Sequence, residues 1–204
     1  MRIIAIDASP RRGVVSRSVE LAATAAESAG ATVERVRLAD LDIRFCTDCK
    51  MCRLTGACKI DDDLPSLTEQ IASSDGVIFG VPAYFRKADR RLQAILDRLS
   101  SFFADDGQLR LPGFSEHEVP RTSAARAAKR AVIITACSTP EPVATFFGYS
   151  TGPIRELREA LGSGGIRTVG SLSVSGTWRH REPQLDEWEC DKARSLGRVL
   201  AGKI

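Results

Sequence analysis

Short uninterrupted apolar runs, separated by helix-like stretches, are the feature that most restricts how this 204-residue chain can fold. The runs at 3–6, 77–81 and 131–136 contain almost no polar side chains, as expected of parallel strands buried on both faces. Weaker strand patterns cover 32–38 and 166–174, and helical patterns cover about 16–29, 61–71, 89–103, 151–161 and 185–200. This alternation predicts an α/β fold in which helices cover both faces of a doubly wound, five-stranded parallel sheet.

Composition and charge argue against several functional classes. The formal net charge is only +3 and the arginines are scattered, so no basic stripe with interleaved aromatics suggests a nucleic-acid partner. No apolar run approaches the roughly 20 residues that a bilayer-spanning helix requires. The N-terminal run becomes polar at Asp7, too early for a signal peptide. We therefore expect a single cytoplasmic domain, residues 1–204, without a membrane partner.

Four of the six cysteines, Cys46, Cys49, Cys52 and Cys58, follow the spacing C-x2-C-x2-C-x5-C. No helix or strand can present four thiols from so short a run, which predicts a loop, residues 44–60, wrapped around a ligand. Compact cysteine runs of this kind hold iron–sulfur clusters. Structural zinc usually uses two well-separated pairs of ligands, and disulfides are disfavoured in a chain without secretory signals. The spacing favours a metal cluster first, free or exchanging thiols second and zinc third.

The turn after the first strand, Ser9 to Ser18, combines hydroxyl groups and arginines directly before a helix. Unpaired N–H groups and the helix dipole make such an N-terminus an anion site, and phosphate is the expected anion. An ordinary capped helix with solvated arginines is the alternative, but it explains only the serines. Neither a G-x-G-x-x-G fingerprint nor a Walker lysine loop occurs, so we do not expect the phosphate of an ordinarily bound NAD or ATP.

Two further loops are expected at the same sheet edge, where ligands bind in doubly wound folds. The loop after the third strand, Pro82-Ala83-Tyr84-Phe85-Arg86, places two aromatic side chains beside a rigid proline, although such aromatics more often pack in a core. The loop after the fourth strand begins Cys137-Ser138-Thr139-Pro140. Cys137, taken by itself, is typical of a small buried side chain at a strand end.

Residues 104–130 interrupt the alternation, since they contain Gly107, Pro112, Gly113 and Pro120 and show no period. A stretch of roughly 25 residues without secondary structure inside a compact domain usually forms a lid, an interface arm or a disordered segment. We expect an irregular insertion that serves as a lid or a subunit-contact arm.

The chain resembles the flavodoxin-like NAD(P)H-dependent FMN reductases, and most closely their iron-sulfur flavoprotein branch. The resemblance is carried by S-P-R at Ser9, the four-cysteine run, G-A-C-K-I-D-D from Gly56, F-G-V-P-A-Y from Phe79 and L-Q-A-I-L-D-R from Leu92. It covers roughly the first hundred residues well and the remainder only in the order of its elements.

The resemblance implies specific ligands for FMN and for a cluster. The FMN phosphate would be held by Ser9, Arg11 and Ser16, with Arg17 and Ser18 nearby. The isoalloxazine ring would be lined by Pro82, Ala83, Tyr84 and Phe85, and its polar edge approached by the loop of Cys137, Ser138 and Thr139. A 4Fe-4S cluster beside the flavin would be ligated by Cys46, Cys49, Cys52 and Cys58. The family also tends to form a homodimer or homotetramer, with the flavin near an interface.

Two positions depart from the family pattern. Asp48 stands where the family often has glycine, and its negative charge lies close to four thiolates, which weighs against a cluster. The family often has asparagine near the position of Val15. Valine lacks the polar side chain but leaves the backbone N–H groups in place, so this departure affects FMN binding less.

The function that these expectations predict is that of an FMN-dependent oxidoreductase. It would take hydride from NAD(P)H and pass electrons to a small molecule such as a quinone, or to a redox protein. The cofactor supplies the chemistry, so no catalytic side chain is required, and the isolated His117 and His180 are not expected to be proton donors. An iron-sulfur flavoprotein that only carries electrons is the second candidate, and a non-catalytic flavodoxin-like binding protein is the third.

Overall fold

The computed structural model describes residues 1–52, 58–83, 90–103, 129–163, 165–177 and 184–203. Its strands form one parallel sheet in the order β2-β1-β3-β4-β5. Their bounds are β1 (Arg2–Asp7), β2 (Thr32–Arg37), β3 (Gly76–Pro82), β4 (Arg130–Ala136) and β5 (Arg167–Val174). The predicted five-stranded parallel sheet is therefore confirmed, with β2 and β5 at its edges.

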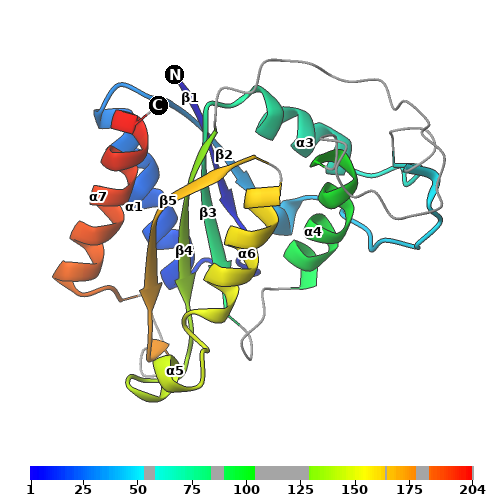
Figure 1. Cartoon of the computed structure of the whole chain (residues 1–204). Helices are drawn as coiled ribbons and strands as arrows, with labels where there is room; N and C mark the ends of the chain where they lie inside the picture. The colour runs from blue at the N-terminus through cyan, green and yellow to red at the C-terminus, as the bar shows by residue number, and fades with distance from the viewer. Residues whose placement is uncertain (53–57, 84–89, 104–128, 164, 178–183, 204) are drawn as a thin grey trace.

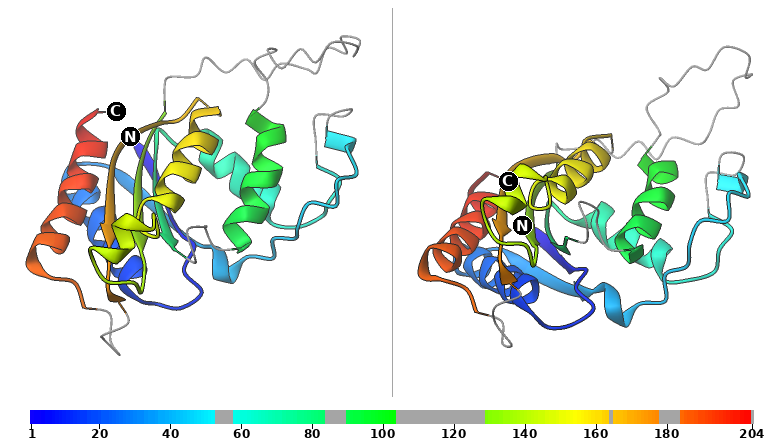
Figure 2. Two further views of the ribbon diagram at one scale, coloured as in Figure 1. Left: turned by 60° about the horizontal axis from the view of Figure 1, so that its bottom comes forward. Right: turned by 90° about the horizontal axis from the view of Figure 1, so that it is seen from below.

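Helices cover both faces of this sheet (Figures 1 and 2). On one face lie α1 (Val14–Ser28) and α7 (Glu187–Lys203); on the other lie α3 (Leu64–Ser73), α4 (Arg90–Phe103) and α6 (Gly152–Ser163). Neighbouring strand residues such as Ile3 and Ile4 belong to opposite apolar layers. Because strand side chains alternate between the two faces and both faces are covered, the central strands are predominantly apolar.

Gly80 of β3 lets α1 approach the sheet closely. A Cβ added at Gly80 would lie 2.2 Å from a Val19 methyl and 2.9 Å from a Val15 methyl. Val15 is therefore a core residue, which gives a packing reason for the valine at a position near which the family often has asparagine. The contact holds the first turn of α1 over β3 and beside the end of β1.

The ends of several elements differ from the sequence prediction. α1 begins at Val14 rather than Ser16, and α3 begins at Leu64 rather than Asp61. The sequence analysis missed the 3-10 turn η1 (Leu38–Asp40) and the helix α5 (Val143–Phe146), which are too short to produce a periodic pattern.

The predicted insertion at 104–130 lies outside the described residues, except for Lys129 and for Arg130, which begins β4. His117 and His180 also lie outside them. Within the described ranges, no helix combines the length and the apolar character needed to cross a bilayer.

Candidate functional site

The loops that follow β1, β3 and β4 start side by side at the carboxyl edge of the sheet. The Ala8 amide donates to the Gly80 carbonyl at 2.8 Å, and the Ala83 amide donates to the Ala136 carbonyl at 2.8 Å. The first bond joins the start of the loop after β1 to β3, and the second joins the start of the loop after β3 to β4. The three loops that the sequence analysis singled out therefore share the edge at which doubly wound folds bind ligands.

Ser9, a predicted phosphate ligand, has a buried hydroxyl without a hydrogen-bond partner among the described residues. The residue is 4% exposed, and within the described part of the chain its Oγ makes no hydrogen bond. Its amide donates to the carboxylate of Asp7 at 2.9 Å, which fixes the turn. Leaving a buried hydroxyl unsatisfied costs about 1–3 kcal/mol, so a ligand oxygen would stabilise this turn.

The first turn of α1 is open to an anion. Gly13 precedes the helix, no side chain among the described residues caps it, and its first turn holds no acidic residue. The Ser16 hydroxyl donates to the Arg11 carbonyl at 3.4 Å, while the Arg11 side chain is exposed beside the turn. Uncapped N–H groups and a nearby arginine are the chemistry that a phosphate group requires.

Arg17 and Ser18 lie differently from the other predicted phosphate ligands. Arg17 is exposed on the surface of α1. Ser18 is fully buried, and its hydroxyl donates to the Val14 carbonyl at 2.9 Å, one turn earlier in the same helix. The hydroxyl of Ser18 is thus satisfied inside α1 and does not share the open turn with Ser9.

The predicted ring-contacting loop after β3 is described only in its first part. Pro82 and Ala83 are half-buried at the edge, and the ladder bond from Ala83 to β4 fixes their place. Tyr84 and Phe85 lie outside the described residues.

The loop after β4 is tied to the loop after β5. Cys137 is buried, and its Sγ lies 3.5 Å from the Thr139 carbonyl oxygen and 3.6 Å from Ser175 Oγ. Ser138 is exposed and Thr139 is half-buried. The Ser175 hydroxyl donates to Glu141 at 2.8 Å, and this bond is the main reason that the pKa of Glu141 lies below its usual value. Sequence analysis missed Ser175 and Glu141, because they are 34 residues apart and carry no shared local pattern.

The cysteine segment (residues 44–60) follows η1, and its described residues 44–52 run outward past α4 (Figures 1 and 2). Cys46 and Cys49 are exposed, Cys52 and Cys58 are half-buried, and all four are free thiols. Among the described residues, no three cysteine, histidine or acidic side chains gather closely enough to hold a metal ion. These four cysteines therefore do not form a preformed cage, and metal sites commonly take their final shape only as the metal binds.

The surroundings of Cys49 nevertheless suit a thiolate ligand. Asp48 and Lys50 have positive φ angles of 49° and 58°, so the backbone turns around Cys49. A hydrogen bond from the Met51 amide, followed by one from the Thr47 hydroxyl, lowers the pKa of the Cys49 thiol. Four thiols are the ligands that an iron–sulfur cluster requires, so the residue types fit such a cluster, although the four sulfur atoms do not lie close together in this structure.

The conformation of Asp48 explains its exchange with glycine. At φ 49° the residue occupies the left-handed region, which glycine enters without steric cost and which aspartate enters more readily than most other residues. The position is therefore defined by its backbone conformation.

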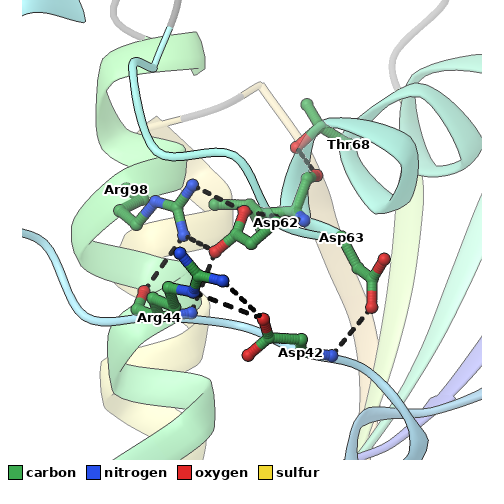
Figure 3. A network of polar contacts seen from close by, with 7 residues as sticks. Asp42, Arg44, Asp62, Asp63, Thr68 and Arg98 are labelled. Atoms are coloured by element: carbon green, nitrogen blue, oxygen red, sulfur yellow. Dashed lines mark hydrogen bonds and ion pairs between the residues drawn. The ribbon is translucent and has the colours of Figure 1, made fainter.

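A buried ion pair between Asp62 and Arg98 lies next to the cysteine segment (Figure 3). The side chains are 0% and 1% exposed, respectively, and Arg98 Nη2 lies 2.9 Å from Asp62 Oδ1. A second contact joins Arg98 Nη1 to Asp62 Oδ2. Burial raises the pKa of Asp62, but hydrogen bonds from Arg98 and from the Arg44 and Leu64 amides outweigh it and hold the pKa below its usual value. Sequence analysis did not identify Arg98 as a site residue.

Comparison with known proteins gives matches in the first half of the chain. A family model described as NADPH-dependent FMN reductase matches residues 1–113. An iron-sulfur flavoprotein of Methanocaldococcus jannaschii is 34% identical over 99 residues, which are 48% of this chain and 51% of that protein. An iron-sulfur flavoprotein of Methanosarcina thermophila is 30% identical over 99 residues, which are 48% of this chain and 52% of that protein. The matches thus span about half the length of these relatives.

Solved structures resemble the chain over nearly its whole length. An NAD(P)H:quinone oxidoreductase from Methanothermobacter marburgensis superposes with a TM-score of 0.70 at 19% identity, covering 98% of this chain and 96% of that one. A flavodoxin from the domain Archaea gives a TM-score of 0.58 at 13% identity, covering 100% and 98%. At such low identity the likeness shows the fold alone, and it confirms the predicted flavodoxin-like architecture.

Proposed function

We propose, because this chain belongs to the NADPH-dependent FMN reductase family, that it is an FMN-dependent oxidoreductase that takes hydride from NAD(P)H. The electrons pass to a second acceptor, either a small molecule such as a quinone or a redox protein. The family match includes the loops after β1 and β3, which are two of the three loops of the predicted flavin site.

The buried hydroxyl of Ser9 is the observation that carries this proposal. It lies just past the carboxyl end of β1, in the turn that leads to the first turn of α1, and it has no hydrogen-bond partner among the described residues. A phosphate oxygen would accept its hydrogen bond while the N–H groups of α1 share the negative charge.

The remaining residues of the edge bind and orient the cofactor. Arg11 supplies a positive charge for the phosphate, Ser16 lies in the same turn, and Pro82 with Ala83 offers a rigid wall for a planar ring. When bound, FMN supplies the hydride and electron chemistry, so the protein contributes binding, orientation and electrostatics.

We further propose that Cys46, Cys49, Cys52 and Cys58 ligate an iron–sulfur cluster, with 4Fe-4S as the expected type. The names of the relatives support it, as does the thiolate-supporting environment of Cys49. A cluster of this kind exchanges single electrons, which suits a redox protein as acceptor. A pure electron carrier remains the second candidate, since the same thiols would serve it equally well.

FMN titration of the purified chain tests the proposal. The wild-type chain is expected to quench FMN fluorescence with one site per chain at micromolar concentration or below. Ser9→Ala should weaken binding by roughly tenfold, the effect of losing a charge-assisted hydrogen bond of about 1.5 kcal/mol. Ser73→Ala is the matched control, because its exposed hydroxyl donates to the Gln70 carbonyl at 3.2 Å, within the last turn of α3.

The outcomes separate the three candidate functions. Steady-state oxidation of NADH or NADPH by the FMN-loaded chain identifies an enzyme. Retained, redox-active flavin without such turnover identifies a carrier, and a chain without redox-active flavin leaves only a binding protein. Absence of FMN binding at micromolar levels would overturn the proposal.

A further inference from the structure

The two arms of the cysteine segment meet at a neck formed by Asp42, Arg44, Asp62 and Asp63 (Figure 3). The Asp42 amide donates to Asp63 Oδ2 at 2.7 Å, and the Asp63 amide donates to the Asp42 carbonyl at 3.0 Å. The Arg44 amide donates to Asp62 Oδ2 at 2.9 Å. The arm that enters the segment is thus bonded directly to the arm that leaves it.

Arg98 reaches this neck from α4 and contacts both arms. Its Nη1 donates to the Arg44 carbonyl at 3.0 Å on the entering arm, and its guanidinium pairs with Asp62 on the leaving arm. Arg98 is only 2% exposed, so this contact is shielded from water. A planar guanidinium with several fixed donors suits such a double contact, whereas a lysine ammonium does not reproduce it.

Burial lowers the pKa of Arg98, but interaction with Asp62 and then with the Cys58 thiol raises it above its usual value, so the guanidinium lies near this sulfur as well. Cys58 and Cys52 are half-buried, whereas Cys46 and Cys49 are exposed, so Cys58 is one of the two less exposed thiols of the segment. Hydrogen bonds to cluster sulfur atoms and nearby positive charge favour the reduced, more negative state of an iron–sulfur cluster.

We propose that the Asp62–Arg98 pair closes the neck of the cysteine segment and holds Cys58 against a fixed positive charge. Arg98 is then a positioning residue that acts through Cys58, and Asp62 is the residue that orients Arg98. The effect of the Arg98 charge on a cluster rests on the cluster of the proposed function, whereas the closing of the neck does not.

Amide hydrogen exchange on the cluster-free chain tests the neck. Arg98→Met should speed exchange at the Arg44 amide by roughly tenfold or more, because its acceptor Asp62 loses its partner. Arg98→Lys should give a smaller increase. Arg194→Met is the matched control, since it removes an arginine from the exposed pair with Asp191 on α7. Unchanged exchange at Arg44 in a folded Arg98→Met chain would overturn the neck, and Asp62→Asn offers a second variant if that chain does not fold.

Anaerobic reconstitution with iron and sulfide tests the charge. Arg98→Met should retain less iron per chain, and its remaining cluster should have a more negative midpoint potential, with Arg98→Lys closer to wild type. Wild-type iron content and potential in Arg98→Met would overturn the role of Arg98. A wild-type chain that takes up no iron would instead overturn the cluster in the proposed function, and with it the effect of the Arg98 charge, while hydrogen exchange still decides the neck.

Discussion

Gly197 of α7 lies directly against the backbone of Ala22 in α1. A Cβ added at Gly197 would stand 2.0 Å from the Ala22 carbonyl oxygen. Both residues are buried, so the two helices on this face of the sheet touch backbone to backbone. The C-terminal helix is therefore held in place by a position that has no room for a side chain.

Gly197→Ala is expected to destabilise the fold. The new methyl group must displace α7 from α1, and overpacking of this kind typically costs about 1–3 kcal/mol. Urea unfolding measures the loss. Gly202→Ala lies in the same helix with nothing within 4 Å of its added Cβ, and it should be neutral or stabilising by up to about 1 kcal/mol. Equal effects of the two substitutions would contradict the close contact.

The Asp62–Arg98 pair should make stability depend on acid. The folded pKa of Asp62 lies below its unfolded value of about 3.9, so the stabilisation is complete above that pH and is lost as the pH falls through the folded pKa. Asp62→Asn should cost about 3–5 kcal/mol at pH 7, because it leaves Arg98 buried without its counter-charge. Unfolding free energies of both chains should converge as the pH is lowered below about 4.

Asp42→Asn is the control for this prediction. Its carboxylate pairs with Arg44 at 3.1 Å, but both side chains are more than 60% exposed, and such pairs contribute about 1 kcal/mol at most. If the free energy of unfolding of the wild type exceeds that of Asp62→Asn by the same amount down to pH 2, the acid dependence does not come from Asp62.

Substitutions at Asp48 should separate backbone from charge. Asp48→Gly and Asp48→Asn should leave the iron content of reconstituted protein unchanged, because both residues accept the left-handed conformation at φ 49°. Asp48→Ala should lower it, since alanine meets a cost of about 1–2 kcal/mol there. Similar losses in the alanine and glycine variants would show that the carboxylate itself matters.

The assembly is predicted to be a homodimer or homotetramer. The expectation comes from the family resemblance, and the proposed contact arm at 104–130 lies mostly outside the described residues. Light scattering with and without FMN measures the mass directly. A monomeric mass under both conditions would rule the oligomer out.

Much of the fold could be predicted from the sequence, because the central strands are buried on both faces. Continuous apolar runs such as Ile3–Ile6 leave few alternatives to parallel strands inside a doubly wound sheet. The start of α1 was harder to predict. The helix begins at Val14, which places Ser18 one turn later with its hydroxyl bonded to Val14, although the sequence alone groups Ser18 with the turn.

The candidate site was predictable only where its residues are neighbours in sequence. The turn at Ser9 and the four cysteines are local patterns. Arg98 falls within a helical pattern that resembles an ordinary amphipathic stripe, and its partner Asp62 lies 36 residues away, just before α3 begins. Sequence analysis placed Asp61, Asp62 and Asp63 at the start of a helix. This agrees with the hydrogen bond from the Leu64 amide to Asp62, but it does not predict the buried partner Arg98.

The closed neck makes the thiol-bearing stretch a separable appendage of the fold. Asp42 and Asp63 are joined by two hydrogen bonds, so the chain leaves the domain and returns to it at one point. The entropic cost of closing a loop changes only slowly with its length, and a turn of a few residues could therefore replace the stretch without redirecting η1 or α3. A chain that exchanged its thiols for such a turn would keep Ser9, Pro82 and Cys137 at one edge of the sheet, so the proposed cluster and the proposed flavin site are separable parts of the fold.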